Sequence, residues 1–392
     1  MISIEEAIQA VKINSFEVSK EIKIPIDKIR NSILFRDIYS PINMPPFRQA
    51  AMDGYAVNSH DDLLYTLVGE VKAGDSHQPL LNKGEAVRIF TGAAVPDSAN
   101  AVIMQEKVVA RENEITIEAK LPIGLNIRLL GEQVKKGQLA LKKGTKLTPA
   151  AIGYLGSLGI NEVSVYKKPS IALISTGNEL VETGQTLTYG KIYESNSLML
   201  QNALINLGFD AVSIHKVEDN YLATYTKLQD VILKNDMVII SGGISVGDYD
   251  FVGKVLNELN VEEVFYKVNQ KPGKPLYFGK KGDTLLFALP GNPAAALTCF
   301  YMYVYTALQK MSGFKEVTLP KVMAKSTSGF VKNGTRPQIL KAIYKEGEVS
   351  ILEGQSSAML QTFSISNALV KMPEDLKQID IKDIIEVILL PF

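Results

Sequence analysis

The sequence is poor in the residues that form disulfides and zinc sites. Its 392 residues include one cysteine, Cys299, which lies in the apolar run "AALTCFYMYVY" and has no partner for an internal disulfide. We therefore expect a buried structural thiol and a reducing compartment such as the cytoplasm. The three histidines, His60, His77 and His215, do not have the spacing of zinc ligands.

Long hydrophobic runs and an excess of one charge are also absent. No apolar run is long enough to span a bilayer, and the start "MISIEEAIQA" lacks the core of a signal peptide. Lysine plus arginine equals aspartate plus glutamate, 42 against 42, which argues against nucleic-acid binding through bulk charge. We therefore expect an ordinary globular protein whose partners are neither membranes nor nucleic acids.

The hydrophobic pattern divides the chain into four predicted domains. "SIEEAIQAV" begins with a capping box, Ser3 with Glu6, and "LTPAAIGYLGSLG" is a second helical pattern that ends at Gly159. We expect these two helices to pack beside one another, with a β-rich module inserted between them. The predicted domains are a discontinuous helical linking domain of residues 1–45 and 140–167, a β-rich inserted domain of residues 46–139, an α/β domain of residues 168–313 and a β-barrel domain of residues 314–392.

Strand patterns alternate with helical patterns from residue 168 onward. "SIALIST", "DMVIISGG" and "TLLFALPG" are near-continuous apolar strands, and a long helix is expected to begin at Pro293. This alternation predicts a three-layer α/β domain with a mostly parallel sheet that helices cover on both faces. Only short strands follow residue 314, which indicates a small β-barrel or sandwich. The expected fold class is thus a multidomain α/β plus β protein.

Polar residues collect where the predicted parallel strands end. In "DMVIISGGISVGDYDFV", Gly242 and Gly243 follow a strand directly, and Asp248 and Asp250 come soon after. Ligands of open α/β sheets bind outside the carboxyl ends of the strands, so other residues that follow strands should lie at the same edge. These residues are Glu179 after "IALIST", Asp219 after "VSIHKV", Lys271, Gly273 and Lys274 after "FYKV", and Pro290, Asn292 and Pro293 after "LLFA".

This set of residues predicts a magnesium–phosphate site. Glycines let backbone N–H groups approach a phosphate, a helix start adds free N–H groups, and lysines supply positive charge. Carboxylates would repel a phosphate unless a cation lay between them, and Mg²⁺ is the usual bridge. Simpler explanations remain, because Asp219, Asp248 and Asp250 are also typical of helix caps and the chain has no Walker A pattern.

Two further polar clusters lie outside the α/β domain. In the β-rich module, "MPPFRQAAMDGYAV" contains Arg48 and Asp53, "RIFTGAAVP" contains Thr91, and "NIRLLGEQV" contains Arg128 and Glu132. Any one of them alone is more often a turn residue or a member of a structural ion pair. In the predicted barrel, Arg336, Ser356 and Ser357 suit a small oxyanion, although exposed loop residues of these types are usually only solvated.

Six motifs occur along the chain in the order "PPFRQAAMDGYAV", "RIFTGAAVP", "STGNEL", "SGGISVGDYDF", "KPGKP" and "LPGNP". In this order they closely resemble the MoeA family, the molybdopterin molybdenumtransferases, to which the C-terminal domain of gephyrin also belongs, and the likeness covers essentially the whole chain. The resemblance implies an elongated four-domain homodimer with a composite active site. It also implies that adenylylated molybdopterin and molybdate bind together, that the phosphoanhydride is hydrolysed with Mg²⁺, and that AMP leaves as molybdenum enters the dithiolene.

The resemblance also assigns roles to residues of this sequence. The functional acids and hydroxyl would be Asp53, Thr91, Glu179, Asp219 and Asp250, and Asp219 and Asp250 would hold the metal. The substrate-binding residues would be Gly242, Gly243, Ser245, Asp248, Lys271, Gly273, Lys274, Pro290, Asn292, Pro293, Arg336 and Ser357. Within this set, Lys271 and Lys274 would contact molybdate or phosphate, and Arg336 and Ser357 would complete a molybdate pocket.

The sequence departs from the family at two positions. Gln133 follows Gly131-Glu132 where many members have an acid, and Asn220 replaces the second acid of a pair after Asp219. Two other functions stay open: adenylyl transfer from ATP to molybdopterin, and a gephyrin-like scaffold whose pocket is vestigial. The adenylyltransferase of the same pathway is a candidate partner, and nothing in the residues separates molybdate from tungstate.

Overall fold

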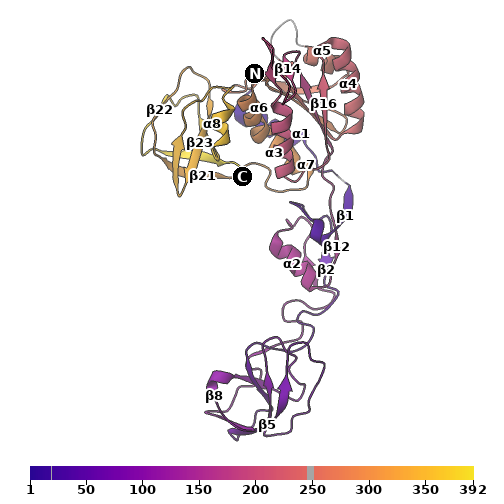
Figure 1. The fold of residues 1–392 in the computed structure, drawn as a ribbon, viewed down its shortest axis with the longest axis vertical. Coiled ribbons are helices and arrows are strands. Elements are labelled where there is room, and N and C mark those ends of the chain that lie inside the picture. Colours follow the sequence, from indigo (N-terminus) through magenta and orange to yellow (C-terminus); the bar gives the residue numbers. More distant parts are fainter. Residues whose placement is uncertain (19, 245–250) are drawn as a thin grey trace. The chain divides into compact units, whose positions relative to one another are not determined.

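The computed structural model describes residues 1–18, 20–244 and 251–392, and Figure 1 shows its elements. The chain forms two compact units. The large unit contains Met1–Ile24, Ile29–Phe35 and Ser164–Phe392, and the small unit contains Pro25–Lys28 and Arg36–Val163. In the part of the chain that the structure describes, no helix has both the length and the apolar character needed to cross a membrane.

The small unit is built around a six-stranded, mostly antiparallel sheet. Its strands follow the order β7 (Ala101–Met104), β4 (Gly54–Val57), β6 (Glu85–Ile89), β5 (Leu64–Val71), β9 (Glu114–Ile117) and β8 (Val108–Arg111). Apolar residues fill both faces, with Val87 and Ile89 in one cluster and Tyr65 and Ile115 in another. A Cβ on Gly54 would lie 1.8 Å from the carbonyl oxygen of Ile103, so only glycine allows β7 to approach β4 this closely.

Shorter elements complete the small unit. They are η1 (Ile26–Lys28), η2 (Gln105–Lys107), the pair β2 (Ile38–Tyr39) with β11 (Leu139–Leu141), the pair β3 (Gln49–Ala50) with β10 (Ile127–Arg128), and helix α2 (Pro149–Ser157). The hydroxyl of Thr148 caps α2 by accepting a hydrogen bond from the Ala151 N–H, and Pro149 stands at the first helical position. The β-rich character that the sequence predicts for this region is confirmed.

The large unit contains a second six-stranded sheet, in the order β16 (Val212–Val217), β13 (Ile171–Thr176), β17 (Met237–Ser241), β20 (Thr284–Leu289), β19 (Tyr277–Lys281) and β18 (Glu262–Tyr266). The first four strands are parallel, and β19 is antiparallel to both neighbours. Strand β13 shows why the strands read as continuous apolar runs, because Leu173 packs into the core on one face and Ile174 into the core on the other.

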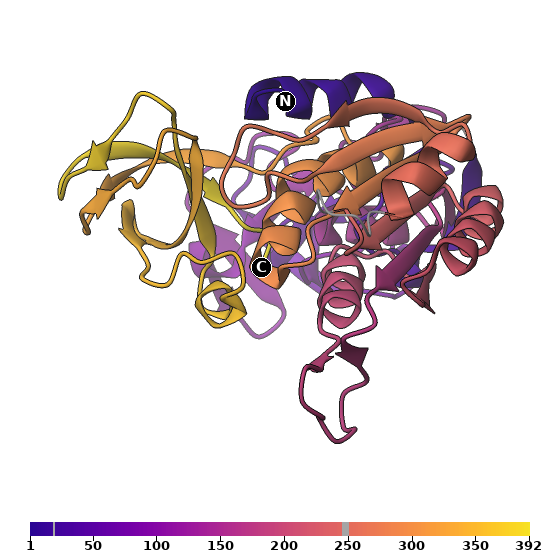
Figure 2. The ribbon, with the colours of Figure 1, turned by 90° about the horizontal axis from the view of Figure 1, so that it is seen from above.

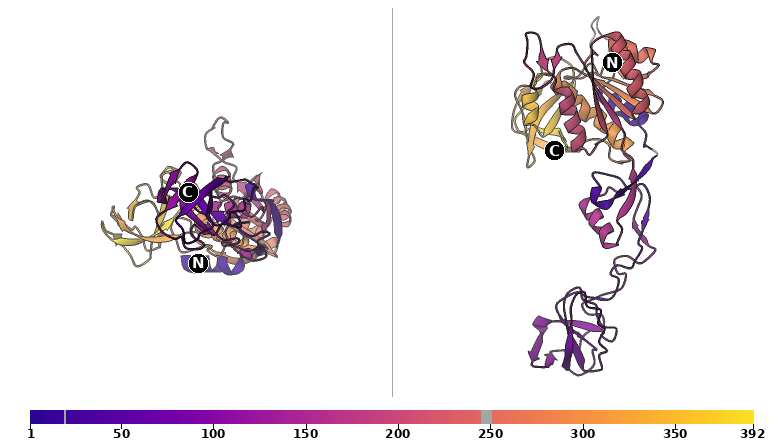
Figure 3. Two further views of the ribbon diagram at one scale, coloured as in Figure 1. Left: turned by 90° about the horizontal axis from the view of Figure 1, so that it is seen from below. Right: turned by 45° about the vertical axis from the view of Figure 1, so that its right-hand side comes forward.

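Helices cover both faces of this sheet, as the sequence predicts. Helices α4 (Tyr221–Lys234) and α5 (Phe251–Glu258) pack on the Ile174 face, and α1 (Ile4–Asn14), α3 (Asn196–Asn206), α6 (Pro293–Cys299) and α7 (Tyr305–Met311) pack on the Leu173 face. The helix expected from Pro293 does run to Met311, but a π-helical segment, η3 (Phe300–Val304), interrupts it. The short strands β14 (Leu180–Val181) and β15 (Ile192–Tyr193) pair, and the segment between them projects from the unit (Figures 2 and 3).

The N-terminal helix differs from the prediction. Ile4, Ala7 and Val11 are buried in the core of the large unit, where α1 packs against α7 and η3, whereas α2 belongs to the small unit. An amphipathic pattern shows that one face of a helix is buried, but it does not identify the partner. The boundaries of the four predicted domains stay a prediction.

A closed barrel forms the C-terminal part of the large unit, as predicted (Figure 2). Its strand order is β21 (Lys321–Ser326), β24 (Glu348–Ile351), β23 (Gln338–Lys345), β25 (Ala368–Met372) and β27 (Ile384–Leu389). The barrel core includes Leu340, Val349, Val370 and Val387. The pair β22 (Phe330–Val331) with β26 (Gln378–Ile379) and helix α8 (Leu360–Ser364) lie in the connections.

Candidate active site

A cavity of about 470 Å³ lies at the carboxyl ends of the parallel strands β13, β17 and β20. This is the edge at which the sequence analysis placed a ligand site. The cavity brings together seven of the predicted residues, Glu179, Asp219, Gly242, Gly243, Pro290, Asn292 and Pro293. We call it the acidic cavity. Ser245, Asp248 and Asp250, which were predicted for the same place, lie outside the described residues.

The two glycines that end β17 are required by close packing. Gly242 and Gly243 have φ angles of +92° and +64°, which side chains rarely adopt. A Cβ on Gly242 would lie 2.7 Å from the Thr176 carbonyl oxygen, and one on Gly243 would lie 2.8 Å from the Thr176 hydroxyl oxygen. Both glycines are half-buried and line the cavity, so a phosphate or other anion can approach the backbone of this turn. The Gly242 N–H is already used, because it donates to the Leu289 carbonyl at 3.3 Å.

The two acids of the cavity influence one another. Burial, and then the negative charge of Glu179, raise the pKa of the Asp219 carboxyl. A cation between the two carboxylates would relieve this repulsion, so the donor set fits a hard divalent ion. Residues 1–18, 20–244 and 251–392 contain no complete group of three metal-ligating side chains. Asn220, which breaks the family's acid pair, accepts a hydrogen bond from the Ala223 N–H and caps α4.

Two buried polar atoms in the cavity have no hydrogen-bond partner among the described residues: the hydroxyl of Thr176 and the side-chain carbonyl of Asn196. The amide nitrogen of Asn196 donates to Ser241 Oγ at 2.7 Å and to the Gly291 carbonyl at 2.8 Å, which ties the end of β17 to the loop before α6. Sequence reasoning missed both residues, although Asn196 begins a predicted helix at the same edge. An unpartnered buried carbonyl suits a ligand that donates a hydrogen bond.

A second cavity, of about 440 Å³, adjoins the first and contains the predicted oxyanion residues. Pro275, Pro290 and Asn292 line both cavities. The residues that line the second cavity include Lys271, Gly273 and Lys274 from the loop after β18 and Arg336, Ser356 and Ser357 from the barrel. We call it the cationic cavity, because three cationic side chains line it. These side chains, of Lys271, Lys274 and Arg336, form no ion pair within the described parts of the chain.

Backbone hydrogen bonds hold the loop after β18 on the barrel. Lys271 N donates to the Pro337 carbonyl at 2.9 Å, and Ile339 N donates to the Lys271 carbonyl at 2.8 Å. Gly273, at φ +85°, sits where a Cβ would lie 2.5 Å from the sulfur of Cys299. Burial raises the pKa of the Cys299 thiol to about 12, so Cys299 is an inert part of this support, as expected.

In the small unit, Asp53 and Thr91 form one hydrogen-bonded pair. The backbone N–H and the hydroxyl of Thr91 both donate to Asp53 Oδ1, each at 2.7 Å, and these bonds lower the pKa of Asp53. The guanidinium of Arg88 lies 5.0 Å from the centre of the Tyr55 ring, donates to the Gly54 carbonyl at 3.0 Å and favours the ionised Asp53. Asp53 is therefore an oriented carboxylate.

Two other candidates of the small unit, Arg48 and Glu132, have structural roles. Arg48 donates to the carbonyls of Ala99 and Pro96 at 3.1 and 2.6 Å and so holds the loop before β7. Glu132 accepts from the Leu129 N–H in a turn. For Arg48 and Glu132, the simpler explanation given in the sequence analysis therefore accounts for what the structure shows.

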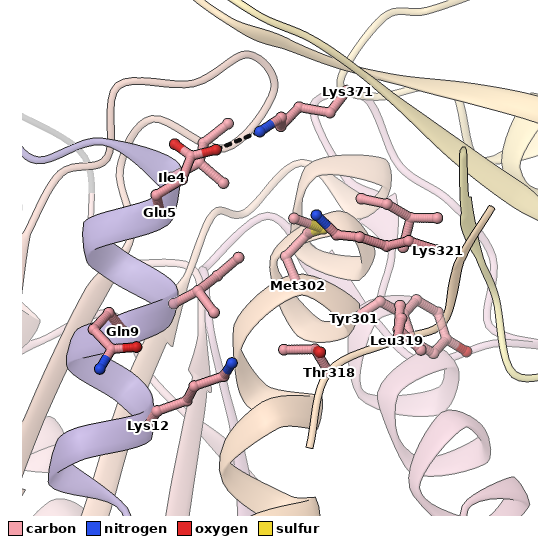
Figure 4. Close-up of a pocket in the computed structure, with 12 residues that line it drawn as sticks. Ile4, Glu5, Gln9, Lys12, Tyr301, Met302, Thr318, Leu319, Lys321 and Lys371 are labelled. Carbon is pink, nitrogen blue, oxygen red and sulfur yellow. Dashed lines mark hydrogen bonds and ion pairs between the residues drawn. The ribbon is translucent and has the colours of Figure 1, made fainter. Parts of the chain in front are cut away.

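A third cavity, of about 250 Å³, contains none of the predicted residues (Figure 4). It lies between α1, the segment around η3 and the barrel, and its lining includes the apolar residues Ile4, Ile8 and Met302 and the cations Lys12 and Lys321. Glu5 forms an ion pair with Lys371 across its edge. No sequence signal predicted this cavity, because it depends on the placement of α1.

Comparison with known proteins identifies the family. The MoeA N-terminal region (domain I and II) matches residues 2–159, the probable molybdopterin binding domain matches residues 172–310, and the MoeA C-terminal region (domain IV) matches residues 323–390. The chain is 36% identical over 360 residues to the molybdopterin molybdenumtransferase of Haemophilus influenzae, with 89% of each chain covered. It is 32% identical over 385 residues to that of Staphylococcus aureus strain Mu50, with 95% of this chain and 91% of the relative covered.

A solved structure agrees with these matches. The crystal structure of the molybdopterin biosynthesis MoeA protein from Pyrococcus horikoshii superposes with a TM-score of 0.85 at 29% identity. The superposition covers 99% of this chain and 100% of the Pyrococcus horikoshii chain. The chain therefore belongs to the MoeA family, whose curated relatives are molybdopterin molybdenumtransferases.

Proposed function

We propose that this protein inserts molybdenum from molybdate into adenylylated molybdopterin, with hydrolysis of the phosphoanhydride and release of AMP. One observation supports the proposal most strongly. The acidic cavity and the cationic cavity share Pro275, Pro290 and Asn292. The two adjoining cavities would give neighbouring sites to two substrates of different chemistry, one a phosphoanhydride and one an oxyanion.

The cationic cavity is the proposed site for molybdate. Lys271, Lys274 and Arg336 supply positive charge without carboxylate partners, and a tetrahedral dianion needs such compensation. Ser357 Oγ accepts a hydrogen bond of 2.9 Å from the side-chain amide of Asn292. Because a hydroxyl has one proton to donate, this bond leaves the Ser357 O–H free to donate to an oxyanion oxygen.

The acidic cavity is the proposed site for the phosphoanhydride. The turn at Gly242 and Gly243 exposes backbone to the phosphates, and Asp219 and Glu179 supply the carboxylates. Water attacks one phosphorus, the bond to the bridging oxygen breaks, and one of the two carboxylates receives the proton of the water. Mg²⁺, held by Asp219 together with Asp250, would neutralise charge on the phosphates.

We further propose that the active form is a homodimer in which Asp53 acts in the site of the partner chain. The support is the family resemblance and the orientation of Asp53 by Thr91. A cytoplasmic location suits the single buried thiol, and the adenylyltransferase of the pathway would supply the substrate.

The test is a reconstitution with purified components. Protein, adenylylated molybdopterin, molybdate and Mg²⁺ should yield AMP and pterin-bound molybdenum in equal amounts. Consumption of ATP in the presence of molybdopterin, without molybdenum transfer, would instead identify an adenylyltransferase. Failure to restore molybdoenzyme activity in an insertase-deficient extract, from a folded protein, would favour a scaffold.

A further inference from the structure

We infer that Lys341 is a positioning residue for the molybdate site. It is a buried ammonium that holds the barrel loop of residues 354–359 in the conformation that presents Ser356 and Ser357 to the cationic cavity. This inference rests on the function proposed above. Lys341 itself does not line the cavity.

The contacts of Lys341 account for all of its hydrogen-bonding capacity. The residue lies on β23 with 3% of its surface exposed. Its Nζ donates to the carbonyls of Gly354 at 2.9 Å, Met359 at 3.1 Å and Ser356 at 3.2 Å. An ammonium has three protons and no acceptor, so these three carbonyls satisfy it completely. Burial lowers the pKa of Lys341, which shows that this placement has an electrostatic cost.

The backbone of Lys341 also holds the loop, through the side chain of Gln355. The side-chain oxygen of Gln355 accepts from the Lys341 N–H at 2.9 Å, and its amide nitrogen donates to the Lys341 carbonyl at 2.9 Å. The backbone and the side chain of Lys341 thus bind four loop residues, counted as Gly354, Gln355, Ser356 and Met359. The loop is therefore fixed to β23 at Lys341, five positions after Arg336, which lines the cationic cavity.

The other side of the loop is fixed to α6. Ala295 N donates to the Ser357 carbonyl at 3.1 Å, and the Asn292 amide donates to Ser357 Oγ at 2.9 Å. Ser357 therefore lies between an anchor at the start of α6 and an anchor in the barrel. Loss of the Lys341 ammonium leaves the carbonyls of Gly354, Ser356 and Met359 without this donor. Only the contacts of Gln355 and Ser357 then hold the loop beside the cationic cavity, so its conformation is less well fixed.

The barrel offers a matched control. Lys332 is also buried, with 8% of its surface exposed, and its Nζ also donates to backbone carbonyls, those of Pro373 and Glu374, each at 2.6 Å. Neither carbonyl belongs to the cavity. Lys332→Met therefore removes a buried ammonium with a comparable role in folding, while the 354–359 loop keeps its contacts.

The experiment measures molybdate binding to the full chain by titration calorimetry, with Michaelis constants for both substrates. Lys341→Met should weaken molybdate binding and raise the KM for molybdate by at least about tenfold, because charge-assisted hydrogen bonds are lost. The KM for adenylylated molybdopterin should change less than about twofold, since its proposed cavity is untouched, and Lys332→Met should leave both constants unchanged. A general loss of stability would not separate the two substrates.

A second variant applies where Lys341→Met does not fold. Gly354 has a φ of +73°, and a Cβ there would lie 2.6 Å from Thr362 Oγ1, so Gly354→Ala displaces the same loop while keeping the ammonium. It should weaken molybdate binding in the same selective way. The inference is overturned if folded Lys341→Met binds molybdate with wild-type affinity. If only Gly354→Ala folds, wild-type affinity in that variant overturns it. In both cases the proposed function is unaffected. A wild-type protein that binds no molybdate overturns both.

Discussion

The acidic and the cationic cavities of the large unit touch one another and yet differ in how their charges are compensated. In the acidic cavity, burial and then the negative charge of Glu179 raise the pKa of Asp219, and these two carboxyl groups lie at the ends of parallel strands. In the cationic cavity, Lys271, Lys274 and Arg336 have no carboxylate partners in the described residues. Each cavity therefore lacks the charge that its proposed ligand would bring: a cation with phosphate in one, an oxyanion in the other.

The difference also shows how each site is constructed. The acidic cavity lies at the edge of one sheet, where strand ends and tight glycine turns place most of the predicted residues, and β14, β15 and the start of α3 complete its lining. The cationic cavity joins a loop of the α/β sheet to a loop of the barrel through Lys271 N–H···O=C Pro337 and Asn292···Ser357 hydrogen bonds. Changes in the two cavities should accordingly affect two different steps of the reaction.

The largest effect is expected from the acidic cavity. Asp219→Asn removes one of the two carboxylates while keeping the size of the side chain, and it should lower AMP release by about 100-fold, as the loss of a transition-state electrostatic contact typically does. Molybdate binding should be unchanged, because Asp219 does not line the cationic cavity. AMP release and molybdate titration on the same protein check both parts. Wild-type AMP release by this variant would show that Asp219 has only a structural role in the turn before α4.

A slightly smaller effect is expected from the cationic cavity. Lys274→Ala should weaken molybdate binding by about 1.5–3 kcal/mol, which corresponds to the loss of one charge-assisted hydrogen bond. Lys345→Ala, on the exposed end of β23, is the control and should bind molybdate normally. Calorimetric titration gives the affinities and thermal unfolding gives the stability. Normal binding with a much lower Tm for Lys274→Ala would show that the lysine stabilises the fold instead.

Subunit mixing extends the comparison to the small unit. At molybdate concentrations too low to saturate Lys274→Ala, that variant and Asp53→Ala should each have little activity. After subunit exchange the mixture should recover activity in roughly a quarter of all sites, because half the dimers are mixed and one site in each is intact. Activity after verified exchange is the measurement. Recovery of nothing would show that Asp53 acts within its own chain or only orients its turn with Thr91.

The smallest effect concerns stability. The folded-state pKa of Asp219 is raised, so its contribution to the free energy of unfolding increases as pH falls through that pKa. Above that pKa the carboxylate is ionised beside Glu179, and the fold is less stable. Asp219→Asn should therefore raise Tm slightly at neutral pH without a divalent ion. Adding Mg²⁺ should raise the Tm of the wild type and not that of the variant. Equal Tm values at neutral pH, followed by equal responses to Mg²⁺, would contradict this view of the two carboxylates.

How far the sequence predicts these features depends on whether they are local. Apolar strands that end in glycine or acid predict the acidic cavity, because parallel strands bring their carboxyl ends together whatever the order of the strands. Lys271 and Arg336 are different. Their meeting in one cavity depends on the docking of the barrel against the loop after β18, and only the family resemblance predicted it.

Three residues show what pattern alone could not find. Lys341 stands in "QILKA", where a strand lysine normally faces solvent, but the 354–359 loop covers it. Asn196 opens a helix and so resembles a simple cap, although its amide joins two loops of the acidic cavity. The face of α1 that contains Ile4 was predictable, but its partner α7 was not. In each case the missing information is which distant segment packs on the residue.

The central claim is that the two cavities hold two different substrates side by side. Crystals of the full chain soaked with molybdate, AMP and Mg²⁺, with anomalous diffraction recorded at the molybdenum absorption edge, test it most directly. We predict a molybdenum peak among Lys271, Lys274, Arg336 and Ser357, and the phosphate of AMP at the turn formed by Gly242 and Gly243. A molybdenum peak in the acidic cavity, or AMP bound in the cationic cavity with molybdate displaced, would contradict the account.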